Sequence, residues 1–218
     1  MIDAQNKWWH HLIIAVLTFG GVFLVWFLKV EEMALTQQTI NQFSRPVGAV
    51  PFILLFLTML IGPVMKLKPS LFEDLGDFPY SWRAELGIWF AFWAVIHTLF
   101  VVYSRDGFLD YLEGISPWAL GALIAVVMAV VLAFLSHKKA IKWLTADCWK
   151  WLQNHFTYAI WWLTVIHVLD RALLRPGFPS GDLLHWLYLI MVVLIPLLQF
   201  IAFVKTVKEN RKERNSQD

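Results

Sequence analysis

Six long apolar stretches dominate this sequence, and each is long enough to cross a lipid bilayer. An α-helix rises about 1.5 Å per residue, so about 20 residues span the hydrocarbon core. Of the 218 residues, 59% are hydrophobic and only 16% are charged, which is unlike a soluble domain. The pattern predicts an all-α membrane protein, a bundle of six transmembrane helices that forms a single domain over residues 1–218. The spans are expected near residues 11–29, 47–66, 85–103, 118–136, 154–173 and 184–205.

The segments between these spans are short, which restricts what else the chain contains. They leave no room for a soluble nucleotide or flavin domain, and the sequence has no glycine-rich dinucleotide-binding pattern. The first apolar stretch lacks a convincing signal-peptide cleavage site, so we expect a retained helix. Any electrons that the chain handles are therefore expected to come from another molecule.

Lysine and arginine are unevenly distributed between alternate connections, which predicts the orientation in the membrane. Thirteen of the 18 lie at the N-terminus, in the second and fourth connections and in the C-terminal tail. Basic residues near helix ends favour the cytoplasmic side, so both termini are expected there. The basic tail fits an anchor on anionic lipid better than a nucleic-acid patch. The predicted location is the bacterial inner membrane, with no nucleic-acid partner.

Two of the seven histidines lie deep inside predicted spans, with apolar residues on both sides. His97 follows the predicted start of the third span by twelve residues, or about 18 Å. His167 follows Asn154, the predicted start of the fifth span, by thirteen residues, or about 20 Å. Both imidazoles are thus expected at one level, in the outer half of the bilayer. Four histidines at predicted helix ends are expected to be satisfied by water or headgroups, namely His10, His11, His137 and His185.

Several kinds of site contain two such histidines. Each histidine alone is adequately explained as a polar residue that hydrogen-bonds a neighbouring helix. Zinc normally takes four ligands, and a proton relay is expected to recruit an intramembrane Asp or Glu, which is not apparent here. Two neutral imidazoles that face each other across a helix bundle are able to ligate heme iron from both sides. Heme b is the favoured ligand, and the candidate partners of its propionates are Arg105, Arg171 and Arg175.

Two segments also carry a family resemblance. The segment "WRAELGIWFAFWAVIHTLFVVY" resembles the third helix of the ferric-reductase-like transmembrane domains, a family that includes the heme-binding membrane subunits of bacterial periplasmic methionine sulfoxide reductase systems. The segment "KWLQNHFTYAIWWLTVIH" is similar to the fifth helix of that family. The matching residues are Arg83, Leu86, Gly87, His97 and Tyr103 in the first segment, and Phe156, Tyr158 and His167 in the second. A weaker match lies in the second span, at Gly48 and Pro63.

The resemblance implies a six-helix heme b protein that passes electrons outward. Their source would be a quinol or a reduced flavin, with FMN or a quinone as the donor cofactor, and their destination a periplasmic oxidoreductase. The family often has a further histidine thirteen residues before the second ligand, where this chain has Asn154. Because Arg83 lies fourteen residues before His97, we expect a single heme. Arg83, Asn154 and His155 outline the expected cytoplasmic mouth for the donor.

Two other functions agree with the same residues. One is direct reduction of ferric or other metal chelates at the outer surface, where basic side chains attract anionic chelates. The other is a transporter or structural membrane subunit without a cofactor, in which the two histidines only hydrogen-bond within the bundle. Transport would be expected to show inverted repeats or broken helices, of which Pro63 and Pro196 are weak hints.

Overall fold

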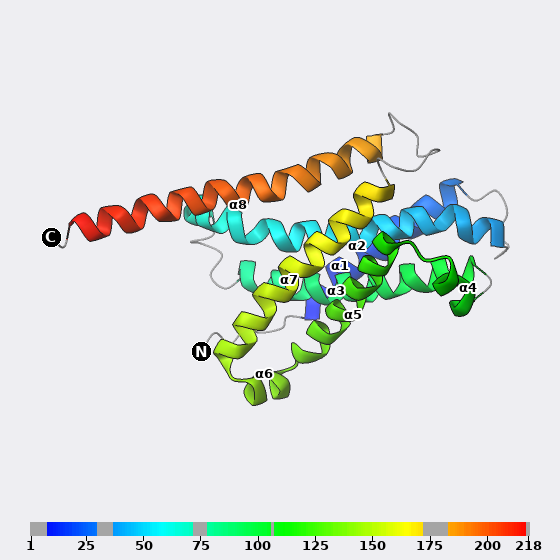
Figure 1. Ribbon diagram of the computed structural model, residues 1–218, viewed down its shortest axis with the longest axis horizontal. Coiled ribbons are helices and arrows are strands. Elements are labelled where there is room, and N and C mark those ends of the chain that lie inside the picture. The colour runs from blue at the N-terminus through cyan, green and yellow to red at the C-terminus, as the bar shows by residue number, and fades with distance from the viewer. Residues whose placement is uncertain (1–7, 30–36, 72–77, 106, 172–182, 217–218) are drawn as a thin grey trace.

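The computed structural model describes residues 8–29, 37–71, 78–105, 107–171 and 183–216, which form helices and turns with no strand among them (Figure 1). The predicted all-α class is therefore confirmed. The long helices are α1 (Trp8–Lys29), α2 (Gln37–Leu67), α3 (Phe78–Tyr103), α5 (Pro117–Leu135), α7 (Ala146–Leu169) and α8 (Leu183–Asn215). Three short helices lie between them, namely η1 (Pro69–Leu71), α4 (Phe108–Glu113) and α6 (Lys138–Leu144).

The long helices alternate in direction along the bundle. In Figure 1, α1, α3 and α7 run one way, while α2, α5 and α8 return. The start of α1 and the last turn of α8 consequently lie toward the same end. We call this end, where α3 and α7 begin, the inner end, and the opposite one the outer end.

In the part of the chain that the structure describes, five helices are long and apolar enough to cross a membrane. They contain the segments Trp8–Phe27, Pro46–Leu67, Trp82–Tyr103, Pro117–Leu135 and Trp186–Asn215. Many of their large apolar side chains are exposed, as helices that face lipid require. The protein is thus a multi-pass membrane protein.

Helix α7, the expected fifth span, has the length of a span but is less apolar than the others. It begins at Ala146, eight residues before the expected start at 154, and its first turn contains Asp147, a favourable position for an acidic residue in the helix dipole. The polar run at 153–155 lies inside the helix, which lowers its mean hydropathy.

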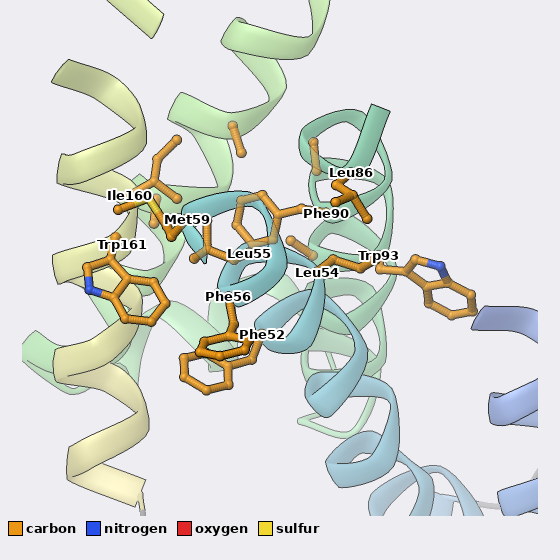
Figure 2. Close-up of a cluster of buried hydrophobic side chains, with 14 of the residues drawn as sticks. Phe52, Leu54, Leu55, Phe56, Met59, Leu86, Phe90, Trp93, Ile160 and Trp161 are labelled. Carbon is orange, nitrogen blue, oxygen red and sulfur yellow. The ribbon is translucent and has the colours of Figure 1, made fainter. Parts of the chain in front are cut away.

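Helix α2 occupies the centre of the bundle. Figure 2 shows its buried side chains between those of α3 on one side and α7 on the other. Phe52 of α2 stacks on Trp161 of α7, with ring centroids 5.9 Å apart and an interplanar angle of 16°. At the inner end, the Lys205 ammonium of α8 donates hydrogen bonds to the last carbonyls of α2, on Lys66 and Leu67, at 2.9 and 3.2 Å. The central helix therefore packs closely on α3 and touches α7, which lies mainly against α5.

Candidate cofactor site

Two stripes of side chains face each other between α3 and α7. Residues seven apart on a helix lie two turns apart on nearly the same face, about 10 Å along the axis. Arg83 and Phe90 of α3 line the same pocket as Gln153 and Ile160 of α7, so both faces border it. Seven residues further along each helix stand the two deep histidines. We call the two stripes together the seam, which consists of Arg83, Phe90 and His97 on α3, and Gln153, Ile160 and His167 on α7.

The seam brings the two predicted iron ligands to corresponding positions. Helices α3 and α7 run in the same direction (Figure 1), and His97 and His167 each follow a residue of the shared pocket by seven positions. Both side chains are half-buried. This arrangement supports the expectation that the imidazoles occupy one level near the outer end.

Gly48 of α2 leaves space for the His97 imidazole ring. A Cβ atom at Gly48 would lie 2.7 Å from Cε1 of His97, closer than real contacts allow, so a larger residue there would require the ring to move. One imidazole nitrogen faces the backbone of Ser44, one turn earlier on α2. The Nδ1 atom of His97 is buried and has no hydrogen-bond partner in the described part of the chain.

Positive charge gathers near the outer end of the seam. Burial raises the pKa of the Tyr111 phenol in α4, and the charges of Arg171 and Arg105 act on it in the opposite direction. Arg171 also interacts electrostatically with His97. Two of the three predicted propionate partners are therefore near enough to one phenol for their charges to act on it. Arg175, the third, lies outside the described residues.

The inner half of the seam borders a small open pocket of about 50 Å³. Of the residues predicted at the donor mouth, Arg83 lines it, whereas Asn154 and His155 are exposed and are not among its lining residues. His155 instead shares a hydrogen bond of 2.7 Å between its Nδ1 and the carbonyl of Trp151, and stacks on that indole. Gln153, which sequence reasoning missed, takes the position opposite Arg83.

Sequence reasoning also missed a buried contact between a histidine and a glutamate at the inner end. His10 of α1 and Glu85 of α3 are 1% and 2% exposed, and His10 Nδ1 lies 3.1 and 2.9 Å from the two carboxylate oxygens. The rings of Trp9 and Trp82 pack around His10. The expectation that His10 is satisfied by water or headgroups is wrong, because α1 docks this end against α3. Glu85, expected only as the boundary of a span, is an intramembrane carboxylate of the kind that the sequence did not reveal.

The remaining histidines at helix ends have simpler surroundings. His11 Nδ1 accepts a hydrogen bond of 3.1 Å from the Trp89 indole, which adds to the contact between α1 and α3. His137 caps α6, since its Nδ1 accepts a hydrogen bond of 3.3 Å from the backbone of Lys139. The side chain of His185 lies outside the described residues.

Comparison with known proteins gives no match, either with a protein-family model or with a curated protein. The resemblance to ferric-reductase-like domains therefore rests on the individual residues described above. Among these, Arg83 and His97 lie on the α3 face of the seam and His167 on the α7 face, while Gly48 makes room for the His97 ring.

Proposed function

We propose that this chain is a heme b electron-transfer subunit of a bacterial inner membrane. It takes electrons from a quinol or a reduced flavin at the inner, cytoplasmic end and passes them to a periplasmic oxidoreductase at the outer end. Both termini are cytoplasmic, and α7 is the fifth of six spans. The observation that carries this proposal is that His97 and His167 each follow a residue of one shared pocket by seven positions, on two helices that run in the same direction.

The residues around this level fit such a group. His97 and His167 would hold the iron through imidazole nitrogens, and Gly48 keeps the α2 backbone away from the first of them. Arg105 and Arg171 supply positive charge near the outer end, where two propionates would need it. Bound there, heme b supplies one-electron redox chemistry with both axial positions filled. The buried Nδ1 of His97, without a hydrogen-bond partner among the described residues, is the kind of polar atom that a binding site retains.

The place of α7 in the bundle supports six spans. Its polar residues Gln153 and Thr157 line the interhelical pocket, and Trp161 and Val165 are each 1% exposed against neighbouring helices. Polar side chains within a membrane helix normally face the bundle interior. A span with one buried face tolerates a lower mean hydropathy than one surrounded by lipid.

A cofactor-free structural subunit is the second candidate, and one contact favours it. An imidazole nitrogen of His97 faces the Ser44 backbone, as expected of a histidine that joins two helices by a hydrogen bond. This alternative predicts that His97→Ala lowers stability in a protein that never contains heme.

A reduced-minus-oxidised absorption spectrum of protein made under heme-sufficient conditions separates the two candidates. We expect a heme b spectrum, and we expect His97→Ala and His167→Ala each to retain less than about a tenth of the heme, because an axial ligand is lost. His155→Ala is the matched control on α7, since His155 is exposed, and its heme content should stay near that of the wild type. Absence of the spectrum, or heme loss in the control only, would refute the proposed site.

A further inference from the structure

Helix α6 lies at the inner end and has two different faces. It connects the inner ends of α5 and α7 (Figure 1). Lys139 is followed three and four residues later by Lys142 and Trp143, so these side chains share one face. All three are exposed, the Trp143 indole by 80%. The other face is half-buried and consists of Ala140, Ile141 and Leu144. The short helix thus directs two cations and an aromatic ring away from the bundle.

The turn between α6 and α7 is strained. Thr145 has φ 68° and ψ 153°, a conformation that β-branched residues rarely adopt. Such a conformation costs free energy, and it persists where surrounding contacts offset that cost. Because of this turn, α6 does not continue into α7 as one helix. The exposed face of α6 is therefore a candidate for contacts with a molecule outside the chain.

The charge around α6 is strongly positive. Residues 134–151 contain four lysines and one acidic residue, Asp147. In the part of the chain that the structure describes, no carboxylate pairs with the ammonium of Lys139 or Lys142. The second turn of α7 repeats the combination of an exposed cation and an exposed indole, with Lys150 and Trp151. This combination suits the headgroup region of a bilayer, where ammonium groups meet phosphates and indole rings lie beside the hydrocarbon.

The position of α6 places it at the margin of the membrane. The apolar span of α5 ends at Leu135, directly before α6, and Phe134 in its last turn is 76% exposed. Helix α7 then returns into the bundle, where Thr157 and Ile160 are buried. Because the helices on both sides are held in the bundle, the basic face of α6 stays near the headgroups.

The basic end of α8 differs, because it extends away from the membrane. Lys205 donates hydrogen bonds to the carbonyls of Lys66 and Leu67, and the apolar span of α2 ends at Leu67. Arg211 and Arg214 follow Lys205 by six and nine residues, or about 9 and 14 Å along the helix axis. Figure 1 shows this part of α8 extending past the other helices. Salt screens charges over about 8 Å, so these arginines act on headgroups less than α6 does.

We propose that the exposed face of α6 binds the headgroup of an anionic phospholipid in the leaflet at the inner end. The ammonium groups of Lys139 and Lys142 contact the phosphate, and the Trp143 indole packs beside the glycerol and the first part of the acyl chains. A zwitterionic lipid fits less well, because its own cationic group is repelled by the two lysines. The inference goes beyond the proposed function and does not depend on heme.

Native mass spectrometry of the purified protein tests this site. The protein is titrated with phosphatidylglycerol, or with phosphatidylcholine that has the same acyl chains. Each basic residue near an anionic surface contributes about fivefold to binding. We therefore expect the first phosphatidylglycerol to bind about tenfold or more tightly than the first phosphatidylcholine, and Lys139→Gln/Lys142→Gln to abolish this preference. Both lysines are exposed, so the unfolding temperature of this variant should stay near that of the wild type.

The matched control is Arg211→Gln/Arg214→Gln on α8. It also removes two positive charges three residues apart from exposed positions, and it should keep the preference for phosphatidylglycerol within about twofold of the wild type. Equal affinities of the wild type for the two lipids would overturn the proposal. Equal losses in the two double variants would do the same, because they would indicate attraction by overall charge instead of a site on α6.

Trp143→Ala separates the indole from the charges. The indole contacts parts that both lipids share, so the affinities for both should fall by about threefold or more while their ratio stays the same. Trp186→Ala is the control, because Trp186 is 56% exposed at the outer end of α8, and it should change neither affinity. Unchanged affinities in Trp143→Ala would contradict lipid contact by α6.

An acidic protein is the other occupant that this charge could attract. Polyglutamate serves as its probe in the same titration. Binding of polyglutamate that Lys139→Gln/Lys142→Gln abolishes, in a protein whose wild type shows no preference for phosphatidylglycerol, would overturn the lipid assignment. Preference for phosphatidylglycerol without binding of polyglutamate would support it.

Discussion

The inner and outer ends of α3 use the same helix geometry for different purposes. At the outer end, His97 packs against α2 so closely that a Cβ at Gly48 would lie 2.7 Å from its ring. At the inner end, a Cβ atom built at Gly62 of α2 would lie 3.8 Å from Nη1 of Arg83, which is an ordinary van der Waals contact. Glu85 meets His10 on another face of the inner end. The outer end of α3 is thus packed closely against α2, whereas its inner end has the buried Glu85 carboxylate and borders a pocket.

Breaking the contact between His10 and Glu85 should have the largest effect on stability. Glu85→Ala leaves His10 buried without its carboxylate, which typically costs about 3–5 kcal/mol for a buried pair. Thermal or denaturant unfolding in detergent would measure this loss. Glu209→Ala is the control, because Glu209 pairs with Lys205 at 3.7 Å on an exposed part of α8 and should cost less than about 1 kcal/mol. Equal effects of the two substitutions would contradict the role assigned to Glu85.

Crowding the outer end should have a smaller but more specific effect. Gly48→Ala forces the His97 ring away from α2, and we expect a loss of about 1–3 kcal/mol in stability together with weaker heme retention. Gly62→Ala on the same helix makes an ordinary contact with Arg83 and should be neutral or stabilising by up to about 1 kcal/mol. Heme content and unfolding measured on both variants test the comparison, which fails if Gly62→Ala is the more damaging one.

Tyr111→Phe should have the smallest effect. Burial raises the pKa of this phenol above its ordinary value of 10.0, so the folded state favours the protonated form. The stabilising contribution of the protonated phenol is fully present below that ordinary pKa and is lost as the pH rises through the raised pKa. The wild type should therefore lose somewhat more stability than Tyr111→Phe in alkaline unfolding titrations, by about 1 kcal/mol or less. Identical alkaline unfolding profiles of the wild type and Tyr111→Phe would contradict a raised pKa for the Tyr111 phenol.

Much of the fold follows from hydropathy read along the chain. The apolar runs locate all six long helices, because a segment in lipid must satisfy its backbone internally and therefore forms a helix. Hydropathy places the beginning of α7 too late, because Asp147 and the polar run at 153–155 lower the hydropathy of its first half. The short helices α4 and α6 escape sequence reasoning, because hydropathy carries no signal for them.

The candidate site, like the fold, is only partly predictable from the sequence. His97, His167 and Arg83 are visible in the sequence as ionisable residues at unusual depths, and their spacing of seven can be read there. Sequence reasoning selects Asn154 rather than Gln153, because neighbouring residues on a helix differ by about 100° in direction and only the packing shows which one faces the pocket. The sequence does not reveal the partner of His10, because Glu85 lies 75 residues further along the chain.

Residue type and local order alone establish that this chain is helical, lies in a membrane and carries two deep imidazoles. Which helix faces meet is a property of the tertiary structure. Packing set α3 opposite α7 along the seam, placed Tyr111 beside two arginines, and buried His10 against Glu85. These contacts join residues far apart in the chain, and their register depends on how the side chains of α2 pack between its neighbours.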